Sequence, residues 1–116
     1  MRENVIKNKS FEFALNIVSL HKYLVEDRKE YVLSKQLLRS GTSIGAMVRE
    51  SEHAESKADF VHKLSIALKE ANETEYWLEL LYKSDYIDET HYTSHISEIM
   101  VIMKLLISII KTSKTK

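Results

Sequence analysis

Two histidines one helical turn apart come closest to a chemical site in this sequence. Three residues separate His91 from His95, and Asp88 lies one turn before them. Imidazoles at positions i and i+4 of an α-helix share a face, which suits them to bind one zinc ion. Polar contacts at a helix end or at an interface explain the same residues, and the sequence therefore assigns no metal ligand.

A second motif, Glu50-x-x-His53, has the spacing of the di-iron ligands in some four-helix bundles. If Ile44 lies at the centre of the core, both side chains point outward, because each residue turns an α-helix by about 100°. The chain also has no cysteine, and it lacks the Gly-x-Ser-x-Gly elbow of many acyl-transfer enzymes. We therefore expect no catalytic residue, no cofactor and no enzymatic activity.

Basic side chains indicate a different function, contact with the phosphates of nucleic acids. Lys35, Arg39 and Arg49 share an outward face of their predicted helix. Lys111 and Lys114 lie near the C-terminus, which an up-and-down bundle brings close to the N-terminus. Both clusters are candidate contacts for RNA or DNA. A solvated face with ion pairs between helices is the alternative.

The composition limits the class of protein. A chain of 116 residues and 13.5 kDa predicts one domain, residues 1–116. Its 17 basic and 17 acidic residues cancel, which argues against a histone-like nucleic-acid binder. The cancellation is uneven, since the net charge is +4 over residues 1–49, −8 over 50–98 and +4 over 99–116. The absence of proline, with only two glycines, argues against a loop-rich or all-β fold.

Apolar residues repeat with the period of an α-helix in four segments. These segments are predicted at about residues 11–26, 31–53, 57–83 and 89–112. Ser10, Ser56 and Asp88 are the predicted N-caps, because their side-chain oxygens can accept the first free backbone N–H groups. Short connections make consecutive helices antiparallel, so we predict an all-α fold, an up-down-up-down antiparallel four-helix bundle.

Two glycines, Gly41 and Gly45, lie inside the second predicted helix. Each costs about 1 kcal/mol relative to alanine at such a position. Their spacing of four residues lets the backbone of another helix approach closely. We therefore predict close helix packing at both glycines; a hinge at Gly41 is the alternative.

Three of the predicted helices have more apolar surface than one monomer core can use. On the first helix, one stripe contains Phe11 and Leu15, and the stripe on the opposite face begins at Phe13. A surface helix of a monomer needs only one such stripe. We therefore predict self-association, with a larger monomer core and ordinary exposed apolar residues as the alternative. The predicted subunit interface consists of Phe13, Ile17, Leu20, Leu24, Ile66, Trp77 and Leu80.

Nothing in the sequence predicts export or a membrane anchor. The longest apolar run, Ile99 to Ile110, has 12 residues and is interrupted by Lys104 and Ser108. A membrane-spanning helix needs about 20 apolar residues. The charged start of the chain does not resemble a signal peptide. The expected location is therefore the cytoplasm.

Three segments of the sequence resemble a known bacterial family. They are LSKQLLRSGTSIGA at residues 33–46, FVHKLSIALKEA at residues 60–71 and ETEYWL at residues 73–78. Nearly the whole chain resembles the four-helix-bundle proteins encoded in intervening sequences of 23S rRNA genes. The resemblance implies a bundle that assembles as a homopentamer. No enzymatic activity is established for the family, so it supplies no catalytic residue.

A related branch of that family is the accessory variability protein of diversity-generating retroelements, a basic pentameric barrel that binds nucleic acid and a reverse transcriptase. The present chain differs in its net charge of zero, and Met47 stands where the family pattern usually has asparagine. Two functions are therefore expected. One is an oligomeric scaffold or chaperone associated with RNA or DNA. The alternative is a protein-interaction or structural oligomer without nucleic-acid binding.

Overall fold

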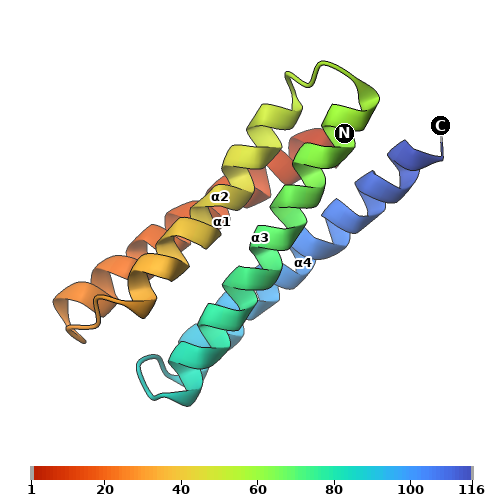
Figure 1. Cartoon of the computed structure of the whole chain (residues 1–116). Coiled ribbons are helices and arrows are strands. Elements are labelled where there is room, and N and C mark those ends of the chain that lie inside the picture. Colours follow the sequence, from red (N-terminus) through yellow and green to blue (C-terminus); the bar gives the residue numbers. More distant parts are fainter. Residues whose placement is uncertain (1, 116) are drawn as a thin grey trace.

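The computed structural model describes the backbone of residues 2–115 and the side chains of residues 4–115. This part of the chain forms four helices, α1 (Arg2–Glu26), α2 (Leu33–Ser51), α3 (Lys57–Lys83) and α4 (Glu89–Lys114). They run alternately up and down in a bundle 47 Å long (Figure 1). Each helix packs against the next and α4 packs against α1, whereas no Cα atoms of the diagonal pairs of described helices lie within 8 Å of each other. The predicted all-α four-helix fold is confirmed.

The core is a column of apolar side chains along the axis of the bundle, and all four helices contribute to it. Its largest fully buried members include Phe13, Ile17, Leu37, Ile44, Leu64, Leu78, Ile99 and Leu106. One polar contact crosses this column, since the hydroxyl oxygens of Thr74 and Ser40 lie 2.9 Å apart and form a hydrogen bond between α3 and α2. Each hydroxyl also contacts a backbone carbonyl of its own helix, that of Glu70 for Thr74 at 2.8 Å and that of Leu37 for Ser40 at 3.5 Å, so both buried groups are satisfied.

Two of the three predicted N-caps are confirmed. The Ser56 hydroxyl accepts from the backbone N–H of Asp59 at 3.0 Å, and the Asp88 carboxylate accepts from that of His91 at 2.8 Å. The prediction for Ser10 is wrong, because α1 begins at Arg2 and Ser10 lies inside it. Ser10 is buried, and its hydroxyl donates to the carbonyl of Lys7, one turn earlier in the same helix.

The connection between α1 and α2 depends on two residues that the sequence analysis did not single out. Lys29 has a φ of 57°, the left-handed conformation that often follows a helix. Glu30 is 6% exposed, and its carboxylate accepts from the backbone N–H groups of Val32 and Ser34 at 3.0 and 3.1 Å. This carboxylate therefore caps α2, which is two residues shorter at each end than predicted.

Among the described helices, α4 is long and apolar enough to cross a membrane by length and composition, with a mean hydropathy of 1.6. Only 28% of its apolar window is buried within the chain, although Ile99, Ile102 and Leu106 lie in the core. Its exposed face carries Lys104 and Lys111. Charged side chains near the centre of a bilayer are costly, which favours a bundle helix. The absence of a membrane partner stays a prediction.

Candidate subunit and nucleic-acid interface

Helices α1 and α2 approach closely at two glycines. A Cβ atom added to Gly41 would lie 2.9 Å from Cγ2 of Ile17, and one added to Gly45 would lie 3.4 Å from the backbone oxygen of Ser10. Both glycines therefore lie where α2 packs on α1. Helix α2 continues through Gly41 without a break, and neither glycine has a positive φ, so the structure contains no hinge there.

The predicted subunit interface on α1 is wrong. Phe13, Ile17 and Leu24 are fully buried within a single chain, and Leu20 is only 3% exposed. Side chains that fill the core of one subunit cannot offer a contact surface to a second copy. The core stripe of α1 also extends further than predicted, since it begins at Ile6, which is 2% exposed.

The opposite face of α1 is the one that remains apolar and exposed. Phe11 and Leu15 are 48% and 53% exposed. Beside Phe11, a shallow groove of about 300 Å³ runs between α1 and α2. Its floor consists of the small residues Ala14, Thr42, Gly45 and Ala46. At its edge, the Arg49 guanidinium lies 5.2 Å from the centroid of the Phe11 ring, a cation–π contact. We call Phe11, Leu15 and this groove the α1 surface.

A second apolar surface lies on the outer side of α3. Tyr76 is 57% exposed, and three predicted interface residues, Ile66, Trp77 and Leu80, are half-buried. The rings of Tyr76 and Trp77 pack edge to face with their centroids 5.0 Å apart. The indole N–H of Trp77 donates to Glu73 at 2.9 Å, and this hydrogen bond lowers the pKa of the Glu73 carboxyl. We call Tyr76, Trp77 and Leu80 the α3 surface.

One of the three cations predicted as a nucleic-acid contact on α2 is engaged in ion pairs. Arg39 bonds to Glu70 at 3.1 Å and also to Glu73, both on α3. These carboxylates raise the pKa of the Arg39 guanidinium, chiefly through the hydrogen bond to Glu73. Lys35 and Arg49 are exposed, and Lys35 pairs with no residue that the structure describes. The predicted basic stripe is therefore interrupted at its middle residue.

The other predicted cluster lies near the end of α4. Lys111 and Lys114 are exposed, and this end of α4 is at the same end of the bundle as the start of α1 (Figure 1). Two turns before Lys111, Lys104 is exposed as well. Lys7 of α1 pairs with Glu52, the residue after α2, at 3.3 Å, so part of the positive charge at this end is neutralised.

A polar pocket of about 310 Å³ between α1 and α4 contains both histidines of the predicted pair. The Nδ1 atom of His91 lies 2.8 Å from a carboxylate oxygen of Asp88, and that of His95 lies 2.7 Å from the backbone oxygen of His91. Hydrogen bonds from the backbone N–H and then the ring of His91 lower the pKa of the Asp88 carboxyl. Within the described part of the chain, no group of three or more His, Asp or Glu side chains is placed to hold a metal ion.

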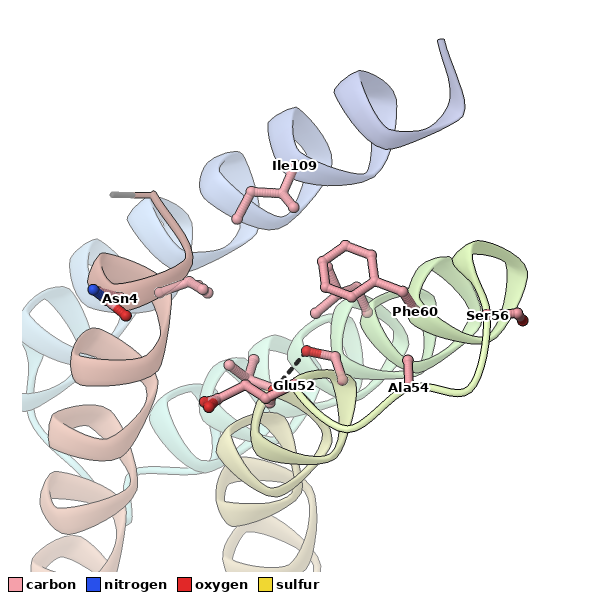
Figure 2. Close-up of a pocket in the computed structure, with 10 residues that line it drawn as sticks. Asn4, Glu52, Ala54, Ser56, Phe60 and Ile109 are labelled. Atoms are coloured by element: carbon pink, nitrogen blue, oxygen red, sulfur yellow. Dashed lines mark hydrogen bonds between the residues drawn. The ribbon is translucent and has the colours of Figure 1, made fainter. Parts of the chain in front are cut away.

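A cavity of about 440 Å³ opens at the end of the bundle where α2 connects to α3. Phe60 of α3 and Ile109 of α4 flank it, and Ile6, Val48 and Leu64 complete its apolar wall (Figure 2). The carboxylate in its wall, Glu52, is the partner of the Lys7 ion pair. The cavity offers apolar volume but no free acid–base pair among its lining residues.

Comparison with known proteins identifies the family. Residues 2–108 match the family model described as 23S rRNA-intervening sequence protein. A solved structure of a protein with unknown function, from the S23 ribosomal protein family of Bacteroides thetaiotaomicron, has a TM-score of 0.95. The two chains are 62% identical over 96% of this chain and 99% of that chain. No curated protein matches the sequence. The chain therefore belongs to the 23S rRNA-intervening sequence protein family.

Proposed function

We propose that this protein is a non-enzymatic scaffold that assembles into a ring of identical subunits, with five subunits as the expected number. The observation that carries this proposal is the presence of two unlike apolar surfaces, the α1 surface and the α3 surface. The helices α1 and α3 occupy diagonal corners of the bundle, since no Cα atoms of their described residues lie within 8 Å of each other. The two surfaces therefore lie on different helices and share no residue, and each of them borders α2 on one side.

Two unlike surfaces favour a ring over a two-fold dimer. In a two-fold dimer, one patch meets a copy of itself, which would leave the second apolar patch in water. In a head-to-tail contact, the α1 surface of one copy covers the α3 surface of the next copy, so both are buried. Repeating this contact closes a ring when the rotation between neighbouring subunits allows closure.

The charges beside the two surfaces are complementary. Arg49 lies at the edge of the α1 surface, whereas Glu79 lies beside the α3 surface, where it also pairs with Lys83 at 3.8 Å. Opposite charges across an interface speed association and set the orientation of the partners. The uneven charge along the chain, +4 over residues 1–49 and −8 over residues 50–98, supports the same head-to-tail contact.

Light scattering coupled to size-exclusion chromatography, on the full-length chain at micromolar concentration, tests the assembly. We expect a mass near five times the 13.5 kDa of one chain. A mass of 13.5 kDa would contradict the scaffold proposal. A stable dimer would contradict the head-to-tail contact, because a two-fold dimer buries only one of the surfaces.

We propose binding of RNA or DNA as a second function of the same ring. The observation that favours it is the set of exposed lysines on α4, Lys104, Lys111 and Lys114, in a segment without acidic residues. One subunit offers too few phosphate contacts for tight binding at physiological salt. A ring repeats the contacts, and its avidity increases without any new type of contact.

Filter binding of the intact oligomer to a structured RNA, at several salt concentrations, tests this second function. We expect binding that weakens steeply as salt rises. The double variant Lys35→Glu, Lys111→Glu should weaken binding to all sequences alike, because phosphate contacts do not read bases. Arg39→Glu is unsuitable, because it would also break the ion pairs to α3.

The control is Lys57→Glu, a single charge reversal that is compared with Lys111→Glu alone and lies in the first turn of α3, where a helix tolerates acidic residues. It should leave RNA binding unchanged, because it lies in the acidic segment of the chain. Absence of binding to RNA and to DNA at low salt would contradict the second function and leave the protein scaffold in place.

A further inference from the structure

We propose that His91 and His95 bind a divalent transition-metal ion such as Zn²⁺. Both histidines line the polar pocket between α1 and α4. They lie one turn apart on α4, so their side chains project from the face of the helix that meets α1. Tyr23 of α1 stacks on the His91 ring with the centroids 5.6 Å apart, which restricts the orientation of that ring.

Hydrogen bonds hold both neutral imidazoles in the tautomer that a metal site requires. A backbone carbonyl can only accept, so Nδ1 of His95 donates to the carbonyl of His91 at 2.7 Å. The Asp88 carboxylate likewise accepts from Nδ1 of His91 at 2.8 Å. In both rings, Nε2 therefore keeps its lone pair for a cation. Metal-binding histidines usually have such a carbonyl or carboxylate partner on the other ring nitrogen.

The Nε2 atom of His95 reaches the pocket although the residue is only 8% exposed. This nitrogen bonds to no other described residue, since the single hydrogen bond of the ring is made by Nδ1. Among the described residues, no fully buried side-chain nitrogen or oxygen lacks a hydrogen-bond partner. The Nε2 atom is therefore accessible to a small ligand in the pocket rather than enclosed by the core.

The charges around the pocket favour a cation. Glu98 lines the pocket, and one of its oxygens accepts from the side chain of Asn16 of α1 at 2.7 Å. No lysine or arginine is among the lining residues. The carboxylate of Asp88, at the N-terminus of α4, offsets the positive end of the helix dipole. Because two imidazoles fill only two of four tetrahedral positions, two waters would complete the shell of the ion, one more than in open zinc sites with three protein ligands.

Isothermal titration of ZnCl₂ into the tag-free full-length protein tests the site. We expect one Zn²⁺ per chain and a higher melting temperature in its presence. His91→Ala should abolish this binding, because it removes one of two ligands. Asp88→Asn should weaken binding by about 10- to 100-fold, because the neutral amide oxygen is a weaker acceptor than the carboxylate for the Nδ1–H of the ligand. It should leave α4 intact, because asparagine caps a helix as well as aspartate does.

The matched control is His62→Ala, which removes an exposed histidine of α3 outside the pocket and should leave zinc binding unchanged. His95→Ala empties a buried position, so its folding is checked by circular dichroism before the titration is interpreted. The exposed His91 ring makes His91→Ala the decisive variant. Absence of zinc binding by the wild type, or equal binding by wild type and His91→Ala, would overturn the proposal. So would an equal loss in His62→Ala.

Discussion

Replacing Gly41 by leucine is expected to destabilise the protein by about 3 kcal/mol or more, because the new side chain overpacks the α1–α2 contact. Even a Cβ atom at this position would lie 2.9 Å from Cγ2 and 3.0 Å from Cγ1 of Ile17. Ile17 is fully buried, and its branched side chain has one strongly preferred rotamer in a helix. The helices must therefore separate to accept the larger residue.

Alanine variants separate this packing effect from helix propensity, which favours alanine over glycine by about 1 kcal/mol. At Gly45, a new Cβ atom would make an ordinary contact of 3.4 Å with the backbone of Ser10. We therefore expect Gly45→Ala to be neutral or stabilising by up to about 1 kcal/mol. Gly41→Ala should be destabilising, since its clash with Ile17 outweighs the gain in propensity. Chemical denaturation at one fixed protein concentration measures all three variants.

A double-mutant cycle tests whether contact with Ile17 causes the lower stability of Gly41→Ala. In the background of Ile17→Ala, which removes the two closest atoms, Gly41→Ala should become neutral or stabilising. Equal stability of Gly41→Leu and the wild type would contradict the close-packing account. A larger loss for Gly45→Ala than for Gly41→Ala would contradict it as well.

The sequence predicts the fold well where local chemistry and packing agree. Ser56 and Asp88 each precede a long apolar repeat, and each caps the helix that follows. The observed bounds of α3 are those predicted, and α4 begins where its cap predicts. Four such segments with short connections admit few arrangements other than an antiparallel bundle.

The start of α1 and its core-facing stripe were predicted wrongly because the local signal for a helix cap and the packing of the core indicate different answers. Ser10 has the side chain of a cap, and a helix that starts after it has two apolar faces of similar strength. With the helix extended to Arg2, one face gains the regular spacing Ile6, Ser10, Phe13, Ile17, Leu20 and Leu24, in steps of four and three residues. This unbroken repeat was the signal for the core face. Ser10 belongs to it because a small residue is needed beside Gly45.

The sequence does not predict the ion pairs of Arg39, for a different reason. Its partners Glu70 and Glu73 lie 31 and 34 residues away in the chain. Whether they contact Arg39 depends on the axial offset between α2 and α3. The period of the apolar residues does not determine this offset to within one helical turn. Sequence analysis can identify which side chains point outward, but not which outward charges neutralise each other.

The variant Leu15→Glu is expected to reduce the oligomer to single chains. A carboxylate buried at the interface without a partner would cost far more than the contact gains. The subunit itself should remain folded, because Leu15 is 53% exposed and leucine and glutamate have similar helix propensities. Ile17→Glu should instead unfold the chain, since Ile17 is fully buried within the subunit. Light scattering and circular dichroism distinguish these two outcomes.

The control for Leu15→Glu is Thr90→Glu, which adds the same charge in the first turn of α4, where the helix dipole favours it. This variant should assemble like the wild type. An oligomer that persists in Leu15→Glu would contradict the assignment of the α1 surface to the interface.

Mixing two dissociated variants tests whether the contact is head-to-tail. Tyr76→Glu changes the exposed ring of the α3 surface and should also give single chains. A Leu15→Glu subunit keeps its α3 surface, and a Tyr76→Glu subunit keeps its α1 surface, so one intact contact can form between them. The mixture should therefore contain a heterodimer of twice 13.5 kDa that does not grow further. Two-fold contacts through a single patch cannot produce this result, because only the variant changed in that patch would dissociate, and the other variant would still form homodimers.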